Sequence, residues 1–299
     1  ALGTGTASAS TYLRGDGTWA TPSGGTTHAA TVVTAATLPA ASSSNIGSLY
    51  LWLAPNYSST VKSTSTLSTY WTLGDAVGST TAADYENVAP LSVTGGVVFG
   101  QTGRTADTAV KFDGTSGRMF VTSSTLTSLL ASNSSFSFDA WVNMPTPGSG
   151  NNVIMSFGTG SGGFNFGLNS SSQIFTSDVG VAYSATGNTA LAANTWYHVG
   201  FTYSNGYSTL YLNGVSNNYG GSAYTQRANS VYNVGYQTYN NAATYYSGLM
   251  QDAALYSGVM PAATFAAHYA NGTGGLSQQL WVSSMMSNGT YVNRQITLV

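Results

Sequence analysis

Acidic residues and histidines, on which most catalytic and metal sites depend, are few and scattered in this sequence. Its 299 residues include nine acidic residues, three histidines and no cysteine. Glycoside hydrolysis usually needs two carboxyl groups that face one bond, and Asp84 and Glu86 are the pair at a strand-like i, i+2 spacing. This pair falls in a turn-rich stretch, where we expect a solvated loop. We therefore predict no catalytic residue and no enzyme activity.

The histidines do not form a pattern typical of metal ligands. None has a carboxylate or a second histidine at ligand spacing; they are His28, His198 and His268. His198 alternates with Trp196 along a predicted strand, which favours a histidine packed against a sheet. Asp113 precedes a glycine and is typical of a turn, whereas Asp139 lies inside a predicted strand, where it would cap hydrogen bonds. We predict no metal site from these residues.

A tyrosine-rich run between residues 219 and 246 has the chemistry best suited to neutral sugars. A tyrosine ring offers a flat apolar face with a hydrogen-bonding tip, and Asn and Gln supply paired donors and acceptors. The run contains Tyr219, Tyr224, Tyr232, Tyr236, Tyr239, Tyr245 and Tyr246. Some of these rings should pack within the domain or between subunits. We predict glycan contacts from Tyr224, Tyr236, Tyr239, Asn240 and Asn241.

The composition favours an all-β protein with an almost uncharged surface. Apolar residues make up 42% of the chain and aromatic residues 12%, with 36 glycines, and such residues favour strands and turns. Charged residues are only 5% and the net charge is −2, so the basic surface that binds nucleic acid is missing. No apolar run reaches the roughly eighteen residues of a transmembrane helix, so no membrane insertion is predicted.

Short strands separated by turn signals are predicted between about residues 46 and 271. The stretch 136–142 (FSFDAWV) alternates, which places four apolar side chains on one face of a strand. These side chains are Phe136, Phe138, Ala140 and Val142.

Residues 195–203 and 208–215 form a predicted hairpin. They are separated by Asn205-Gly206, a sequence typical of a type I′ turn. Only residues 262–269 (AATFAAHY) show helical spacing of apolar residues.

These patterns divide the chain into four regions. They are an N-terminal assembly segment (1–22), a Ser/Thr/Ala-rich linker with a short strand at 31–34 (23–45), a strand-rich domain (46–272), and a C-terminal tail with a β-hairpin around Asn288-Gly289 (273–299). The assembly segment is too short to bury its own apolar side chains against the cost of ordering them. These side chains, which need another chain as a partner, are Leu2, Tyr12, Leu13 and Trp19.

The assembly segment resembles a known motif. Residues 2–22 read LGTGTASASTYLRGDGTWATP, which is similar to a short repeat-like motif of phage tail fibres and other virion fibre proteins. The resemblance implies a bacteriophage structural protein that docks on other virion proteins through this segment. It also implies a homotrimer, because phage fibres with such motifs usually trimerise.

The strand-rich region resembles the laminin-G-like jelly-roll domains of the concanavalin A-like lectin/glucanase superfamily. The matching pieces, in order, are YWTLGD (70–75), AVKFDGTSGRMFV (109–121), FSFDAWV (136–142), NTWYHVGF (194–201), LYLNG (210–214) and SGLMQDAALY (247–256). The resemblance implies two antiparallel sheets packed face to face, with residues 238–244 in a loop. Such domains can hold Ca²⁺ at one rim, and Asp75, Asp84 and Asp252 are the residues that could supply oxygens for it.

Three functions remain open from the sequence. The first is a tail-fibre receptor-binding protein that presents the lectin-like domain to host surface glycans. The second is a capsid decoration or head-fibre protein with the same architecture. The third, a glycan-degrading enzyme, is disfavoured by the scattered carboxylates. The first two predict a position on the virion surface, at the tail or on the capsid exterior, and no cofactor.

Overall fold

The structure is a computed structural model of the chain. It describes residues 12–13, 19–20, 31–33, 40–44, 48–53, 56–104, 108–131, 134–148, 152–159, 162–178, 184–221, 231–239, 242–273, 278–286 and 289–296. The chain divides into two compact units, one formed by Asn56–Gly275 and the other by Ala1–Pro55 together with Leu276–Val299.

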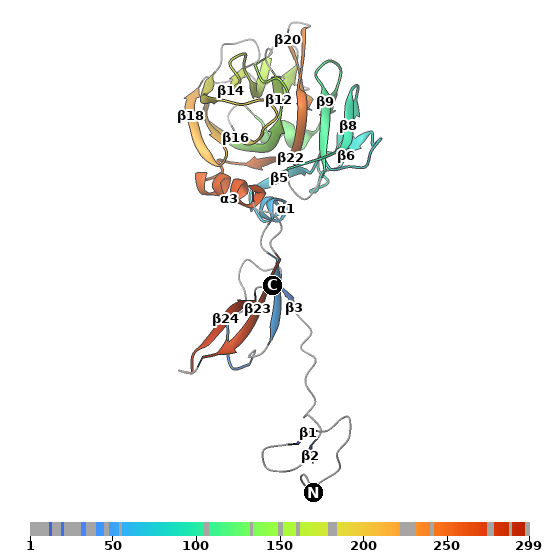
Figure 1. The fold of residues 1–299 in the computed structure, drawn as a ribbon. Coiled ribbons are helices and arrows are strands. Elements are labelled where there is room, and N and C mark those ends of the chain that lie inside the picture. The colour runs from blue at the N-terminus through green and yellow to red at the C-terminus, as the bar shows by residue number, and fades with distance from the viewer. Residues whose placement is uncertain are drawn as a thin grey trace. The chain divides into compact units, whose positions relative to one another are not determined.

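The Asn56–Gly275 unit is a sandwich of two sheets, named here the β12 sheet and the β11 sheet after a central strand of each (Figure 1). All strand pairs within the two sheets are antiparallel. In spatial order, the β12 sheet contains β15 (Ala185–Ala190), β14 (Gln173–Asp178), β13 (Gly162–Leu168), β12 (Asn152–Thr159), β19 (Val231–Val234), β10 (Arg118–Val121), β7 (Leu91–Thr94) and β6 (Thr81–Ala82).

The β11 sheet forms the other layer of the sandwich. In spatial order, it contains β18 (Val215–Gly221), β17 (Tyr207–Leu212), β16 (Trp196–Ser204), β11 (Phe136–Asn143), β22 (Ser247–Ser257), β9 (Ala109–Asp113) and β8 (Val97–Gln101), and β5 (Leu67–Trp71) pairs with β22. The predicted all-β sandwich is confirmed.

The core lies between the two sheets and is rich in aromatic rings. The four apolar side chains of strand β11 that were predicted to share a face are all buried in this core. The ring of Phe138 meets that of Phe166 on the β12 sheet at 5.8 Å between centroids. Trp71 stacks on Tyr232 at 5.3 Å and so joins the sheets at another point. Period-two alternation therefore indicated the inward face correctly.

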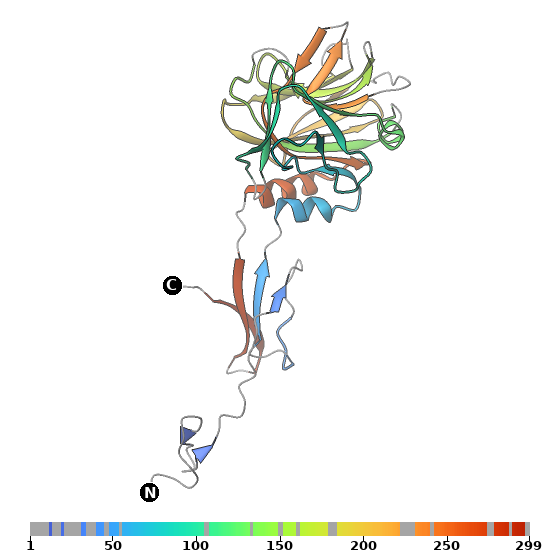
Figure 2. The same ribbon diagram turned by 90° about the vertical axis from the view of Figure 1, so that its right-hand side faces the viewer.

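The outer face of the β11 sheet is also buried, which alternation alone does not predict. Two helices, α1 (Tyr57–Lys62) and α3 (Ala262–Thr273), lie beside each other next to this sheet (Figure 2). A second apolar cluster joins the helices to the sheet and includes Tyr57, Trp141 and Phe265. The third helix, α2, spans Ser124–Leu129. The predicted helix at 262–269 is present and extends to Thr273. None of the described helices has the length and apolar character needed to cross a membrane.

Of two hairpins in this unit, the sequence predicted one correctly and the other incorrectly. Strands β16 and β17 pair around Asn205 and Gly206, whose φ angles of 50° and 86° are those of the predicted type I′ turn. In contrast, β20 (Tyr236–Tyr239) and β21 (Ala242–Tyr245) form a two-stranded hairpin. The prediction that residues 238–244 form a loop is therefore wrong at both ends of this range, which are parts of strands. Thr238 pairs with Ala243, and Tyr239 pairs with Ala242.

The other unit contains a four-stranded sheet. In spatial order its strands are β24 (Tyr291–Ile296), β23 (Gln278–Met285), β4 (Leu49–Leu53) and β3 (Thr31–Val33). Strands β23 and β24 form the C-terminal hairpin, and β3 is parallel to β4. Strand β4 falls in the region 46–272 that the sequence assigned to the jelly roll. The structure instead assigns β4 to the other unit, because β4 pairs with β23.

The same unit includes a very short strand pair in the N-terminal segment. Strand β1 (Tyr12–Leu13) is antiparallel to β2 (Trp19–Ala20), with Leu13 opposite Trp19. The backbone of three of the four predicted assembly residues is therefore paired. Leu2 lies outside the described residues.

Candidate functional site

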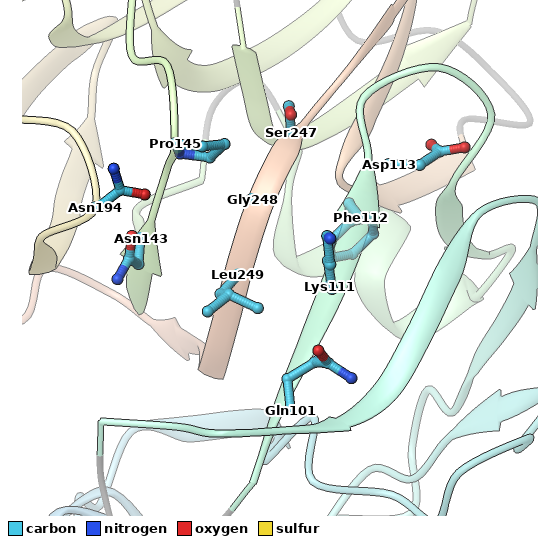
Figure 3. A pocket seen from close by; sticks show the side chains of 10 residues that line it. All are labelled: Gln101, Lys111, Phe112, Asp113, Asn143, Pro145, Asn194, Ser247, Gly248 and Leu249. Carbon is cyan, nitrogen blue, oxygen red and sulfur yellow. The ribbon is translucent and has the colours of Figure 1, made fainter.

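A cleft of about 560 Å³ opens beside strands β8, β9, β22 and β11 of the β11 sheet (Figure 3). Leu249 on β22 is paired with Lys111 on β9 and with Asn143 on β11. Directly opposed residues of antiparallel strands point to the same face, so these three side chains form a row across the sheet. Gln101 and Asn194 add two further amide groups to the lining.

The polar groups that line the cleft have hydrogen-bonding capacity to spare. Among the described residues, no hydrogen bond or ion pair involves the side chains of Lys111, Asn143 or Asn194. Gln101 uses its Nε2, which donates to the carbonyl oxygen of Phe99 at 3.3 Å, and its Oε1 remains unused. Asn194 is held at the rim by its backbone N–H, which donates to the carbonyl of Met144 at 2.7 Å. Such amides can bind both donors and acceptors of a ligand.

The carboxylate in the lining, Asp113, is already fully engaged. Its Oδ1 accepts the backbone N–H groups of Thr115, Ser116 and Gly117, each at 2.9 Å. Its Oδ2 accepts the hydroxyls of Thr115 at 2.8 Å and Ser116 at 2.7 Å. Desolvation raises the pKa of Asp113, but these hydrogen bonds outweigh it and hold the pKa well below its usual range. Asp113 thus organises a turn, as the sequence predicted.

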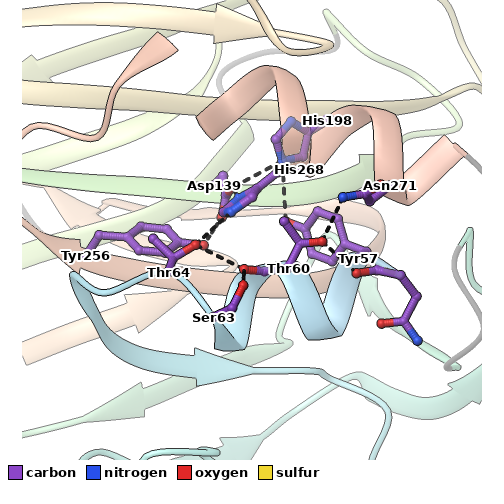
Figure 4. A network of polar contacts seen from close by, with 10 residues as sticks. Tyr57, Thr60, Ser63, Thr64, Asp139, His198, Tyr256, His268 and Asn271 are labelled. Atoms are coloured by element: carbon purple, nitrogen blue, oxygen red, sulfur yellow. Dashed lines mark hydrogen bonds and ion pairs between the residues drawn. The ribbon is translucent and has the colours of Figure 1, made fainter. Parts of the chain in front are cut away.

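A second cluster of polar side chains lies between the outer face of the β11 sheet and the two helices (Figure 4). Asp139 Oδ2 lies 2.6 Å from Nδ1 of His268 and 3.2 Å from Nε2 of His198. Tyr256 donates its hydroxyl to Asp139 Oδ1 at 2.9 Å, and Tyr57 Oη lies 3.3 Å from His198 Nε2. All five side chains are buried.

Electrostatics within this buried network favour an ionised Asp139. Burial raises the pKa of this carboxyl, but the nearby His268 and the hydrogen bonds from both histidines outweigh burial and hold the pKa well below its usual range. Burial, followed by the charge of Asp139, raises the pKa of the Tyr57 and Tyr256 hydroxyls. Since an ionised carboxylate only accepts hydrogen bonds, His198 Nε2 and His268 Nδ1 must carry protons.

This network corrects the interpretation of the histidines as isolated residues. Strand β11 brings Asp139, β16 brings His198, and α3 brings His268 to one point, although 129 residues separate Asp139 and His268 along the chain. Within the described residues, these three form the one group of three side chains close enough to share a metal ion. The contacts to Asp139 have the lengths of hydrogen bonds between a donor and an acceptor. The arrangement fits a structural network that holds α3 on the sheet.

The other acidic candidates hold separate hydrogen-bond partners. Asp84 accepts the backbone N–H groups of Tyr70, Glu86, Val88 and Ala89. The prediction that Asp84 is solvated is wrong, because its carboxylate is buried beneath the loop that it organises. Asp75 accepts the backbone N–H of Ala83 at 3.0 Å, and Asp252 accepts the hydroxyl of Tyr70. Among the described residues, Asp75, Asp84 and Asp252 are not a group close enough to share a metal ion.

Of the tyrosines predicted to bind glycans, only Tyr236 has a described side chain, and Tyr236 does not line the cleft. Tyr236 is half-buried in strand β20, where its ring packs 5.0 Å from that of Tyr245 and 4.8 Å from the Arg118 guanidinium. Tyr239 ends the same strand, and its side chain lies outside the described residues, as do Tyr224, Asn240 and Asn241. Sequence reasoning missed the cleft because its residues come from four strands and two loops that are distant along the chain.

Comparison with known proteins identifies the family to which this sandwich is similar. Residues 113–265, just over half of the 299-residue chain, match the Laminin_G_3 family, described as the concanavalin A-like lectin/glucanases superfamily. The chain belongs to this superfamily. No curated protein sequence matches the chain.

Solved structures similar to this concanavalin A-like domain include a longer chain and a single domain of another protein. Trypanosoma rangeli sialidase aligns with a TM-score of 0.53 and 15% identity over 69% of this chain and 33% of the sialidase. The chain thus spans about a third of the sialidase structure. Domain 4 of AbnA, a GH43 extracellular arabinanase from Geobacillus stearothermophilus in complex with arabinotriose, aligns with a TM-score of 0.48 and 17% identity, over 68% of this chain and 98% of that domain. At these identities the likeness concerns the fold.

Proposed function

We propose that the chain is a surface fibre protein of a tailed bacteriophage whose lectin-like domain binds glycans on the host. The observation that carries the binding proposal is the cleft in the β11 sheet, where unused amides surround an apolar centre at Leu249. Sugar recognition needs such a combination, since amides bond hydroxyls and apolar side chains cover the C–H face of a ring. The fold agrees with it, because the superfamily includes lectins.

Binding without hydrolysis is the second part of the proposal. A hydrolase would need two carboxyl groups across the bond. The carboxylate that lines the cleft is Asp113, and all of its hydrogen-bonding capacity is used within its own turn. The Asp139 network is sealed from solvent, so no external substrate reaches it.

Attachment to the virion is the third part. The sequence motif of residues 2–22 supports a fibre protein that docks on other virion proteins through this segment. Isolated two-stranded pairs are marginal in water, and the strands β1 and β2 are two residues each. A homotrimer would supply the missing partner surfaces for this segment.

The function can be tested by competition on cells. Purified full-length chain, added to host bacteria before the phage, should block adsorption, and enzymatic removal of surface polysaccharide should abolish binding of the chain. Undiminished adsorption at saturating chain would contradict a receptor-binding role. Localising the chain on the particle by electron microscopy then separates tail from capsid, and density on the capsid lattice would favour decoration of the head instead.

A further inference from the structure

The lysine of the cleft is the one described cation of the sandwich that has no partner. The structure describes four Lys and Arg side chains in this unit, and three of them lie over aromatic rings: Lys62 over Tyr85 at 4.5 Å, Arg104 over Trp141 at 5.6 Å, and Arg118 over Phe120 at 4.3 Å. The fourth, Lys111, is exposed on β9 and faces the cleft. In a chain with only seven basic residues, this free charge stands out.

The nearest carboxylate does not compensate Lys111. Asp113 follows two residues later on the same strand, so its side chain points to the same face. Its two oxygens are directed into the 113–117 turn, where they accept five hydrogen bonds. No ion pair joins Lys111 to any described residue. The ammonium group is therefore available to an anion that enters the cleft.

We infer that the cleft binds an anionic saccharide, with Lys111 contacting its carboxylate or phosphate group. This inference rests on the proposed glycan-binding function and names the class of glycan. Lys111 supplies the charge, and Asn143 and Asn194 supply donors and acceptors for hydroxyls. Leu249 lies between Lys111 and Asn143 in the row across the sheet. Salt bridges of this kind are charge-assisted hydrogen bonds, about twice as strong as neutral ones.

Two other ligand classes fit the cleft less well. A neutral sugar would use the amides but leave the ammonium without a partner, so Lys111 would add no affinity. A simple inorganic anion would use Lys111 but leave the flanking amides empty. The volume of about 560 Å³ lies within the range of pockets that enclose small organic ligands, about 300–1,000 Å³.

The test compares matched ligands and matched variants by isothermal titration calorimetry on the full chain. The ligands are a uronic-acid oligosaccharide, its carboxyl-reduced neutral counterpart, a sugar-phosphate oligomer and inorganic phosphate. The variants are Lys111→Gln and, as a control that removes the same charge from α1, Lys62→Gln. Thermal unfolding checks that both variants are folded, as expected for exposed side chains.

We expect both acidic oligosaccharides to bind. Their relative affinities show whether the cleft prefers a carboxylate or a phosphate group. Lys111→Gln should weaken this binding about tenfold or more, the loss expected for one hydrogen bond to a charged group, whereas Lys62→Gln should not. Binding should also weaken as salt is raised, because salt screens the exposed charge.

Equal affinity for the acidic and the carboxyl-reduced oligosaccharide, or an unchanged affinity in Lys111→Gln, would overturn the inference and leave the glycan-binding function intact. Inorganic phosphate binding as tightly as the saccharides would also overturn it, since the amides would then contribute nothing. If no saccharide bound, both the inference and the proposed function would fail.

Discussion

At the scale of single residues, Asp139 is a fully buried carboxylate that depends on its polar partners. A buried charge is tolerated only when partners replace the lost water. Asp139 receives hydrogen bonds from His198, His268 and Tyr256, and Thr64 Oγ1 lies 3.0 Å from the second nitrogen of His268. The network therefore links the sheet to α3 through His268 and to α1 through Tyr57, whose hydroxyl lies 3.3 Å from His198 Nε2.

Replacing His268 with glutamine should destabilise the sandwich strongly. The substitution removes the nearest partner of Asp139 and leaves a buried, poorly compensated carboxylate, which costs about 3–5 kcal/mol. Thr64→Val, which removes only the outer contact of His268, should cost about 1 kcal/mol. Urea unfolding of both variants measures these losses, and equal small losses would show that the network contributes little.

The pKa of Asp139 also predicts how stability depends on pH. Because its pKa is lowered in the folded state, the ionised folded form contributes stability that is fully present above the unfolded pKa, about 3.9. This contribution is lost as the pH falls from about 4 toward the lower folded value. The free energy of unfolding, measured between pH 6 and pH 2.5, should therefore fall less steeply in Asp139→Asn than in the wild type. Parallel slopes would contradict the assignment.

At the scale of elements, close packing of helix α3 on the sheet depends on small residues. A side-chain carbon added at Gly272 would lie 2.4 Å from the Trp141 ring, and one at Gly200 would lie 2.6 Å from the Phe265 ring. The glycines thus let α3 approach strands β11 and β16 closely enough for His268 to reach Asp139.

Gly272→Ala should destabilise the sandwich although alanine favours helices. Alanine is about 1 kcal/mol better than glycine inside a helix, but overpacking against Trp141 costs about 1–3 kcal/mol, so we expect a net loss. Ala267→Gly, at an exposed position of the same helix, measures the difference in helix propensity between alanine and glycine without a change in packing. Thermal unfolding of the two variants measures the difference, and a stabilised Gly272→Ala would show that α3 is loosely packed.

The elements also show what the sequence could and could not predict. Alternation in 136–142 gave the inward face of β11, and Asn205-Gly206 gave the β16–β17 turn, since both signals are local. The burial of Asp139 and Trp141 on the opposite face was not predictable, because helices α1 and α3 come from opposite ends of the domain. The cleft was missed for the same reason: Lys111, Asn143 and Leu249 become neighbours only through strand pairing.

At the scale of the whole molecule, the chain combines a large sandwich with a second unit, whose described elements are a four-stranded sheet and one pair of two-residue strands. Residues from both ends of the sequence form its four-stranded sheet, with β3 and β4 from one end and β23 and β24 from the other. The assembly residues Tyr12, Leu13 and Trp19 lie in two strands of two residues each. We therefore expect this unit to be completed by other copies of the chain.

Native mass spectrometry of the full chain should show three copies of the 30.8 kDa polypeptide. Trp19→Ala should weaken the trimer, because a tryptophan buried between chains contributes several kcal/mol that alanine cannot supply. The sandwich of Trp19→Ala should unfold as in the wild type. A stable wild-type monomer at micromolar concentration would contradict the assembly proposal.

The most direct test of glycan recognition is a crystal structure of the full chain with a bound acidic oligosaccharide. We predict a sugar in the cleft of the β11 sheet, its anionic group at hydrogen-bond distance from Lys111 Nζ and its hydroxyls on Asn143 and Asn194. A sugar bound at Tyr236 on the β20–β21 hairpin, with the cleft empty, would contradict the account.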